Sequence, residues 1–232
     1  MTEGLAGRNL LYRRPELYDE LAREDRSKVE CVVRLVRRYG TPDAASVLDL
    51  GCGTGRDLAG LDGFSRRVGV DLQPRLIRHG QARAPEVELR AGDVRAVRLG
   101  ESFDVILCVG NSFAYLHTDD EQHAAWRTFG AHAHGRTLLL IQTLVVPVPA
   151  GTSGRSRVTT ATMDVETAWD VVWDERRGMS TMRRTWYLEK PETDIIERRV
   201  TPVEELACLA GEHGWRVVDE EMPAGWFAAV AP

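Results

Sequence analysis

The strongest chemical signal in the sequence is a run of glycines directly after an apolar segment. Residues 47–50 lead into Gly51-Cys52-Gly53-Thr54-Gly55. Glycine adopts positive φ and lets a ligand approach the backbone closely, so the pattern predicts a binding turn between a strand and a helix. Arg56 stands where a dinucleotide fingerprint has its third glycine, and the Gly-Lys-Ser/Thr of a phosphate loop is missing. The spacing therefore disfavours a phosphate ligand.

Two acidic residues follow the next apolar runs. Asp71 comes after Val68-Gly69-Val70, twenty positions beyond Gly51, and Asp93 lies just past residues 87–89. A single Asp at such a place is more often a turn former or a helix cap. Together they end strands of one predicted sheet, at the edge where open α/β sheets bind ligands. We expect Asp71 to accept hydrogen bonds from ribose hydroxyls and Asp93 to contact an adenine amino group.

The elements that position these residues follow from the apolar pattern. Apolar runs at residues 46–50, 67–70, 87–89, 103–109 and 137–142 alternate with helical segments that begin near Arg56, Pro74 and Asp119. This alternation predicts βαβ units and a mostly parallel sheet. The apolar spacing over residues 16–39, from Leu17 and Leu21 to Val36, predicts one helix that Gly40 ends.

The pattern changes after Gln142. Alternating segments at residues 167–173, 181–188 and 194–200 predict an antiparallel insertion, which we expect to form the wall of the acceptor pocket. Thr201 as N-cap and Pro202 at the first position predict a helix that ends at Glu212. Two strands at residues 216–218 and 226–230 complete the predicted fold.

Composition limits the class of protein. The chain has 232 residues, 43% hydrophobic and 28% charged, as in an ordinary folded protein. Its net charge of -5 argues against general attraction to nucleic acid or to an anionic membrane. We see no apolar run of about 18 residues and no signal-peptide core, so we expect a cytoplasmic protein. The four widely spaced cysteines are interpreted as buried apolar residues, and no metal site is expected.

With the glycine loop and its two acids, the sequence resembles the class I S-adenosylmethionine-dependent methyltransferases over about residues 18–230. The resemblance implies a doubly wound, Rossmann-like α/β fold: a seven-stranded mixed sheet with a β-rich insertion after the fifth strand. It also implies S-adenosyl-L-methionine as cofactor, with the loop near its methionyl part. The expected cofactor-binding residues are Tyr18, Asp49, Gly51, Cys52, Gly53, Gly55, Asp71, Leu72, Asp93, Val94 and Val109.

A second stretch narrows the resemblance. Residues 103–116, with Gly110-Asn111-Ser112-Phe113, are similar to the fourth-strand motif of glycine and glycine/sarcosine N-methyltransferases and of aminosugar N,N-dimethyltransferases. These relatives share Tyr18-Asp19 and the β-rich insertion over the substrate. In the glycine enzymes the motif's Asn and an Arg after the fifth strand hold the substrate carboxylate. Asn111 remains here, but residues 141–145 contain no Arg, so we expect an acceptor larger than glycine.

Methyl transfer from a sulfonium mainly requires that the nucleophile be held in line and water be excluded. An amine must be neutral to attack, whereas a hydroxyl would need a general base. His117, on the loop after the fourth predicted strand, is the candidate base, and the alternative is a surface loop histidine. We expect Asn111 and Tyr115 to orient the acceptor.

The predicted organisation has four parts: a helical lid at residues 1–40, the cofactor-binding core at 41–150, the β-rich substrate cap at 151–200, and the final helix and hairpin at 201–232. We expect methylation of a small molecule, at an amine nitrogen of a natural-product or sugar intermediate. The alternatives are a small-molecule O-methyltransferase and a non-catalytic cofactor-binding module. Asn111-Ser112-Phe113-Ala114 lacks the motif of base-amino methylases, so no nucleic-acid partner is expected; a homodimer is compatible with the sequence.

Overall fold

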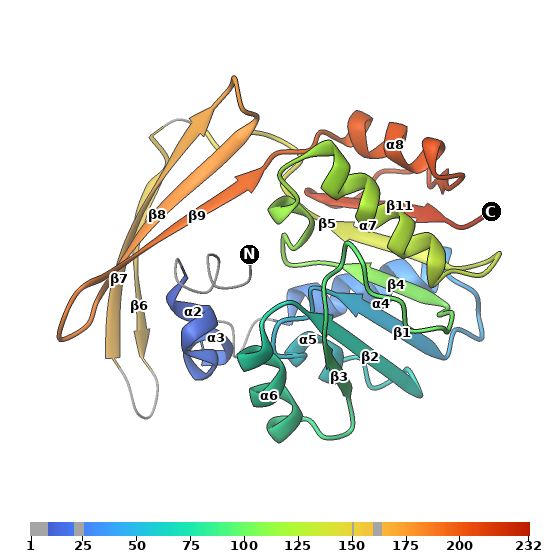
Figure 1. The fold of residues 1–232 in the computed structure, drawn as a ribbon, viewed down its shortest axis with the longest axis horizontal. Coiled ribbons are helices and arrows are strands. Elements are labelled where there is room, and N and C mark those ends of the chain that lie inside the picture. The colour runs from blue at the N-terminus through green and yellow to red at the C-terminus, as the bar shows by residue number, and fades with distance from the viewer. Residues whose placement is uncertain (1–8, 21–25, 150, 160–163) are drawn as a thin grey trace.

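The main element of the computed structural model is a seven-stranded sheet of order β10-β11-β5-β4-β1-β2-β3 (Figure 1). The structure describes residues 9–20, 26–149, 151–159 and 164–232. Strands β3, β2, β1, β4 and β5 run parallel to one another. Strand β11 is antiparallel to β5, and β10 is antiparallel to β11, which confirms the predicted mixed sheet. The strands are β1 (Ser46–Leu50), β2 (Arg66–Asp71), β3 (Glu88–Ala91), β4 (Val105–Cys108), β5 (Leu138–Gln142), β10 (Arg216–Val217) and β11 (Trp226–Val230).

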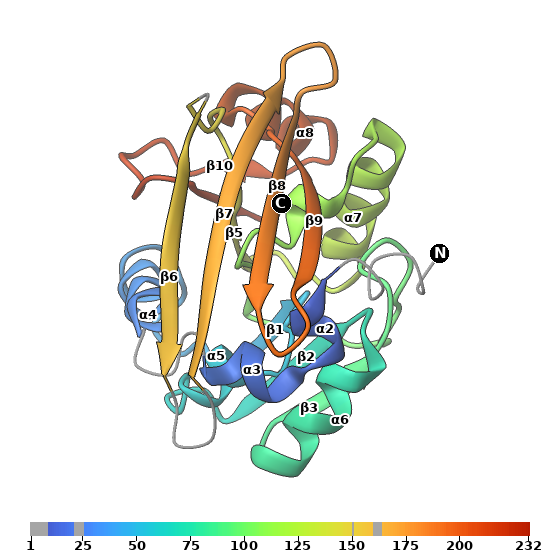
Figure 2. The ribbon, with the colours of Figure 1, turned by 90° about the vertical axis from the view of Figure 1, so that its left-hand side faces the viewer.

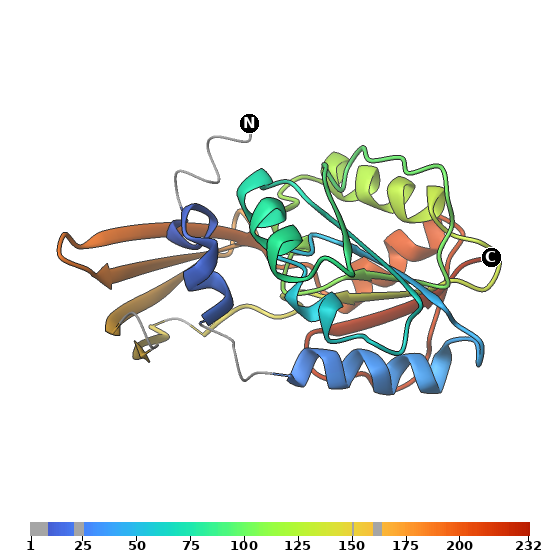
Figure 3. The ribbon, with the colours of Figure 1, turned by 90° about the horizontal axis from the view of Figure 1, so that it is seen from below.

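Helices cover both faces of this sheet, with α4 and α7 on opposite sides in Figure 3. Consecutive residues of β4 belong to different core clusters: Val105 packs with Val32 of α4, and Ile106 with Trp126 of α7. Strands buried on both faces need such continuous apolar runs, and this is why the runs could be located in the sequence. The helices are α4 (Ser27–Tyr39), α5 (Arg56–Ala59), α6 (Pro74–Arg83), α7 (Asp119–Ala131) and α8 (Val203–Glu212).

A second, four-stranded antiparallel sheet lies between β5 and α8 in the chain and forms the cap sheet, seen nearly face on in Figure 2. Its strands are β6 (Ser153–Thr159), β7 (Asp164–Asp174), β8 (Met179–Tyr187) and β9 (Glu192–Arg199). The cap sheet confirms the predicted β-rich insertion. The sequence pattern missed β6 because this edge strand is mostly exposed and only Val158 in it is buried.

The prediction of one helix over residues 16–39 is wrong. The structure has α2 (Leu10–Arg13), α3 (Pro15–Glu20) and then α4 from Ser27; Leu21 lies outside the described residues. Leu17 of α3 packs with Trp186 of the cap sheet, whereas Val29 of α4 packs on the main sheet. A continuous apolar spacing thus serves two separate cores. In Figure 1, α2 and α3 lie between the two sheets.

Two local predictions also need correction. Pro202 is the N-cap of α8, while Thr201 is buried, donates its N–H to Leu144 O at 2.8 Å and accepts from Gln122 Nε2 at 2.9 Å. These long-range contacts hold Thr201 away from the capping position. Cys208 is exposed on α8, and the other three cysteines are buried as predicted.

A buried carboxylate fixes α2 to the cap sheet. Asp194 of β9 is fully buried and accepts hydrogen bonds from Leu10 N at 2.6 Å, Trp186 Nε1 at 2.5 Å and Arg184 Nη2 at 2.9 Å. The Arg184 guanidinium also lies over the Trp186 ring, 4.5 Å from its centroid. One acid therefore compensates the Arg184 charge and orders the start of α2.

We expect Asp194→Asn to lower the free energy of unfolding by about 3 kcal/mol, because the change leaves the Arg184 guanidinium, whose side chain is only 15% exposed, without its counter-charge. Exchange of the Leu10 amide should accelerate as well, and urea unfolding with hydrogen-exchange mass spectrometry measures both. The matched control is Asp164→Asn, whose carboxylate pairs with Arg157 at an exposed site. Unchanged Leu10 exchange in Asp194→Asn would contradict this docking role.

Candidate active site

The glycine loop joins β1 to α5 and takes a left-handed path. Gly51, Gly53 and Gly55 have φ values of 94°, 61° and 73°. Gly51 N donates to Val70 O at 2.7 Å, and Gly51 O accepts from Ser112 Oγ at 3.0 Å. A Cβ on Gly51 would lie 2.4 Å from Ser112 Oγ, so both space and backbone angle require glycine there.

Asp71, the last residue of β2, holds this loop in place. Its Oδ2 accepts from Gly53 N and its Oδ1 from Gln73 N, both at 2.8 Å. Burial raises the pKa of the carboxyl despite these two bonds. A carboxylate has about four lone-pair sites, so both oxygens keep room for hydroxyl donors. The geometry allows the expected ribose contacts and adds a loop-holding role that the sequence did not indicate.

Asp49 lies two residues before Gly51 and is buried in β1. Its Oδ1 has no hydrogen-bond partner among the described residues. Burial, with the charge of Asp57, raises the pKa of Asp49 to about 8, although Lys28 opposes the shift. A buried acid left without a partner at a binding loop indicates a missing polar ligand. The cationic methionyl end of S-adenosyl-L-methionine fits this requirement.

Tyr18 of α3 covers the loop from the lid side. A Cβ on Gly53 would lie 3.0 Å from the Tyr18 hydroxyl. Its neighbour Asp19 is 5% exposed, accepts from Thr54 Oγ1, lies 3.0 Å from His79 Nε2 and pairs with Arg83. Asp19 therefore fastens α3 to the glycine loop and to α6. The Tyr18-Asp19 pair was expected from the resemblance, but the sequence indicated no role for the acid.

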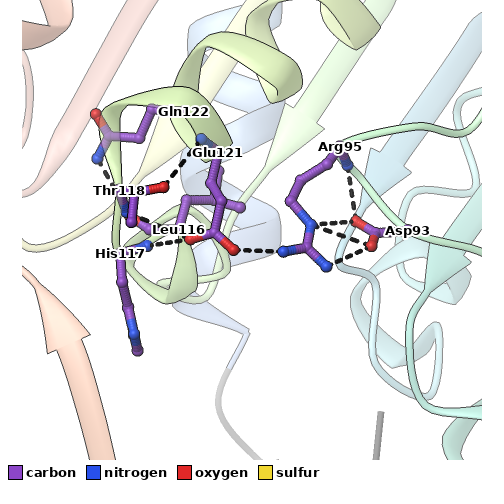
Figure 4. Close-up of polar contacts among 7 residues, drawn as sticks. All are labelled: Asp93, Arg95, Leu116, His117, Thr118, Glu121 and Gln122. Atoms are coloured by element: carbon purple, nitrogen blue, oxygen red, sulfur yellow. Dashed lines mark hydrogen bonds and ion pairs between the residues drawn. The ribbon is translucent and has the colours of Figure 1, made fainter. Parts of the chain in front are cut away.

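The remaining predicted cofactor residues have different surroundings. Asp93 follows β3, and its carboxylate accepts from Arg95 N and Nε at 2.9 Å and from Arg95 Nη2 at 2.6 Å (Figure 4). These contacts lower the pKa of Asp93. Cys52 and Val109 are buried in the core on the α4 side of the sheet. Leu72 and Val94 are half-buried.

On the acceptor side, the chain after β4 forms the short 3-10 helix η1 (Phe113–Tyr115). Asn111 has φ 65° and is the single non-glycine residue with positive φ in the described part. Its N–H donates to Gln142 O at 3.1 Å, and its side chain makes no hydrogen bond to a described residue. Tyr115 and His117 line a small pocket, together with Asn9, Tyr12, Ile195, Ile196 and Glu197.

His117 connects this pocket to the cap sheet. Its ring Nε2 lies 3.1 Å from Glu197 O on β9, and its backbone N–H donates to Glu121 Oε2 at 2.9 Å. A carbonyl only accepts, so Nε2 carries the proton and Nδ1 is the acceptor of the neutral ring. His117 is therefore no free surface histidine. Its role as a base stays a prediction.

Tyr12 was missed by sequence analysis because α2 was not predicted. Burial, with Tyr115 and Asp71 nearby, raises the pKa of Tyr12, and burial raises that of Tyr18. Both phenols are therefore neutral at physiological pH.

Among the described residues, no helix is long and apolar enough to cross a bilayer, and no cluster of three or more His, Cys, Asp or Glu residues could hold a metal.

Comparison with known proteins agrees with this geometry. Residues 47–132 match the family described as a methyltransferase domain. The structure of Streptomyces venezuelae DesVI superposes with a TM-score of 0.83 and 25% identity, covering 94% of this chain and 98% of that chain. The chain carries a class I methyltransferase domain. The prediction of this family with S-adenosyl-L-methionine as cofactor is thereby confirmed.

Two further relatives extend the comparison. An amino pentose methyltransferase of Micromonospora echinaspora, solved with S-adenosylmethionine bound, has a TM-score of 0.81 at 24% identity and covers 94% of this chain and 96% of its own. The dTDP-3-amino-3,4,6-trideoxy-alpha-D-glucopyranose N,N-dimethyltransferase of Streptomyces venezuelae is 33% identical over 106 residues, 45% of each chain. The sequence match thus spans less than half of this curated relative.

We expect Asp71→Ala to weaken binding of S-adenosyl-L-methionine by about 1.5–3 kcal/mol, the loss usual for hydrogen bonds to a charged group. Calorimetric titration measures the dissociation constant. Asp62→Ala is the control, because Asp62 is exposed in the turn before β2, at the opposite end of that strand from Asp71. A dissociation constant that Asp71→Ala leaves unchanged would remove Asp71 from the site.

The raised pKa of Asp49 predicts a pH dependence of cofactor binding. Below about pH 8 the carboxyl is protonated in the free protein, and a cationic ligand favours the carboxylate. Binding should therefore release a proton, and affinity should rise by up to about tenfold per pH unit until the pH reaches that pKa. Calorimetry in two buffers of different ionisation enthalpy counts the proton. Asp49→Asn should abolish the release; equal release by both proteins would exclude Asp49.

Proposed function

We propose that the protein transfers a methyl group from S-adenosyl-L-methionine to the amine nitrogen of a sugar intermediate in a natural-product pathway. The observation that carries this proposal is the pocket between Tyr12, Tyr115 and β9, beside the sheet edge that holds the glycine loop. An amino pentose methyltransferase shares this fold along 94% of the chain. Asn111 lies after β4, and its side chain has no hydrogen-bond partner in the part of the chain that the structure describes.

S-adenosyl-L-methionine supplies an electrophilic methyl group whose bond to sulfur breaks as the bond to nitrogen forms, giving S-adenosylhomocysteine and a proton. The protein's own part is positional. Tyr18 and Asp19 close α3 over the glycine loop and exclude water. The Tyr12 hydroxyl, which its raised pKa keeps neutral, and the Tyr115 hydroxyl can orient the acceptor.

His117 has a positioning role in this proposal. An amine that arrives neutral needs no base during the displacement, and its proton can leave to water afterwards. The His117 ring instead ties the loop after η1 to Glu197 of β9, through Nε2. A hydroxyl acceptor would instead need a base, and Nδ1 is the ring nitrogen that would accept its proton.

The test is turnover with methyl-labelled S-adenosyl-L-methionine and matched acceptors. A nucleotide-linked aminosugar is compared with the same sugar bearing a hydroxyl in place of the amine. The proposal expects label on nitrogen and none on the hydroxyl analogue. Label on the hydroxyl would favour O-methylation, and tight cofactor binding without turnover on a broad amine and phenol panel would favour a non-catalytic module.

The proposal includes a small-molecule acceptor and a cytoplasmic location. It includes no nucleic-acid or membrane partner, which the net charge of -5 supports. The four-part division at residues 40, 150 and 200 belongs to it as well. A homodimer stays a prediction that analytical ultracentrifugation tests.

We expect His117→Asn to reduce turnover by less than about tenfold, because general-base catalysis contributes about 10²–10⁴-fold only where a proton moves in the transition state. The pH limb of the rate should follow the acceptor amine and survive the substitution. Steady-state rates across pH 6–9 measure both. A loss of about 10²-fold or more, with the limb abolished, would make His117 the base.

A further inference from the structure

A chain of charged contacts joins the loop that follows β3 to the start of α7 (Figure 4). It runs from the Asp93 carboxylate through the Arg95 guanidinium to the Glu121 carboxylate, and from there to the backbone N–H of His117. The two ends belong to different parts of the site. Asp93 is the acid expected at the adenine, and His117 lines the acceptor pocket.

Arg95 bridges two acids that are far apart in the sequence. Its side chain is 24% exposed, against 29% for Asp93 and 27% for Glu121, so solvent screens these contacts only in part. The guanidinium cannot lose its proton and presents a rigid fork of donors. Nε and Nη2 bond to Asp93, while Nη1 bonds to Glu121.

Glu121 in turn sets the position of the loop before α7. It is the third helical residue and forms a capping box with Thr118, donating its backbone N–H to Thr118 Oγ1. Its Oε2 also accepts from His117 N at 2.9 Å and from Thr118 N at 3.3 Å. The carboxylate that Arg95 holds therefore holds the His117 backbone.

Asp93 has little capacity for an additional donor. Arg95 N and Nε bond to Oδ1, and Nε and Nη2 bond to Oδ2, so Arg95 already occupies most of the carboxylate's lone-pair sites. An amino group that binds to Asp93 must displace some of these contacts. The same guanidinium also bonds to Glu121, so a change in the Asp93 contacts reaches Glu121 through a single side chain.

We propose that Arg95 is a positioning residue that couples the adenine side of the cofactor site to the His117 loop through Glu121. This inference rests on the proposed function, because it takes Asp93 as the adenine-binding acid. The alternative is that the Arg95 contacts only stabilise the fold, and exposed ion pairs contribute little even to stability. The proposal and this alternative differ in whether cofactor binding changes the surroundings of the His117 ring.

The experiment uses the full chain labelled with ¹⁵N-histidine and S-adenosylhomocysteine as the probe. The imidazole signals of His117 are assigned by their absence in His117→Asn. In the unmodified protein, saturating S-adenosylhomocysteine should shift these signals. In Arg95→Gln the shift should fall below half of that value, while the probe still binds within about tenfold of its original dissociation constant, since tenfold is the loss of a single modest contact.

Two further variants separate coupling from folding. Glu121→Gln keeps a capping residue but loses the charge that Arg95 bonds to, so it should lose the His117 response as Arg95→Gln does. Arg95→Lys keeps the charge without the fork and should restore part of the response. The matched control is Arg66→Gln, because Arg66 pairs with Glu88 and Glu101 at the opposite end of β2. It should respond like the unmodified protein.

A full His117 shift in Arg95→Gln, with the probe bound, would overturn the coupling and leave the proposed function standing. Failure of the unmodified protein to bind S-adenosylhomocysteine would overturn both. Loss of the response in Arg66→Gln as well would also refute the inference, since any removed ion pair would then have the same effect.

Discussion

The left-handed turn of the glycine loop is the constraint on which the rest of the structure depends. Gly51, Gly53 and Gly55 place backbone where no side chain fits, and Asp71 holds that backbone by accepting from Gly53 N. Because β1 and β2 pair in parallel, with Leu50 opposite Val70, both strands end at the same edge. The acid that can receive a ribose is thus the acid that shapes the loop, and damage to Asp71 would affect both functions together.

Helices α2 and α3 carry a second constraint, because one end of this segment is bound to the cap sheet and the other to the glycine loop. Leu10 N is bound to Asp194 of the cap sheet, and Asp19 is bound to Thr54 of the glycine loop and to His79 of α6. A short stretch of chain therefore connects the glycine loop to the cap sheet, with Tyr12 and Tyr18 on it. This arrangement explains how a small cap can exclude water from a reaction that mainly requires alignment.

The sequence was sufficient for the parts that local pattern determines. Residues 46–50 were predicted as a strand with the bounds that β1 has, because Val47, Leu48 and Leu50 give the mostly apolar run that a strand buried on both faces requires. Residues 16–39 failed, since Leu17 and Val29 share a helical spacing while packing in different cores. No role was predicted for Asp19 or Arg95, because their partners His79 and Glu121 are distant in the sequence and no local pattern reports a tertiary contact.

We propose that the carboxyl ends of the parallel strands bind the cofactor while α2, α3 and the cap sheet close the site. Hydrogen-exchange mass spectrometry with and without S-adenosylhomocysteine tests this claim most directly, because it needs no acceptor. We expect added protection at residues 50–56, 71–73 and 92–95, together with residues 10–20, which include α2 and α3. Protection confined to other parts of the chain, or none at a concentration that saturates binding, would contradict it.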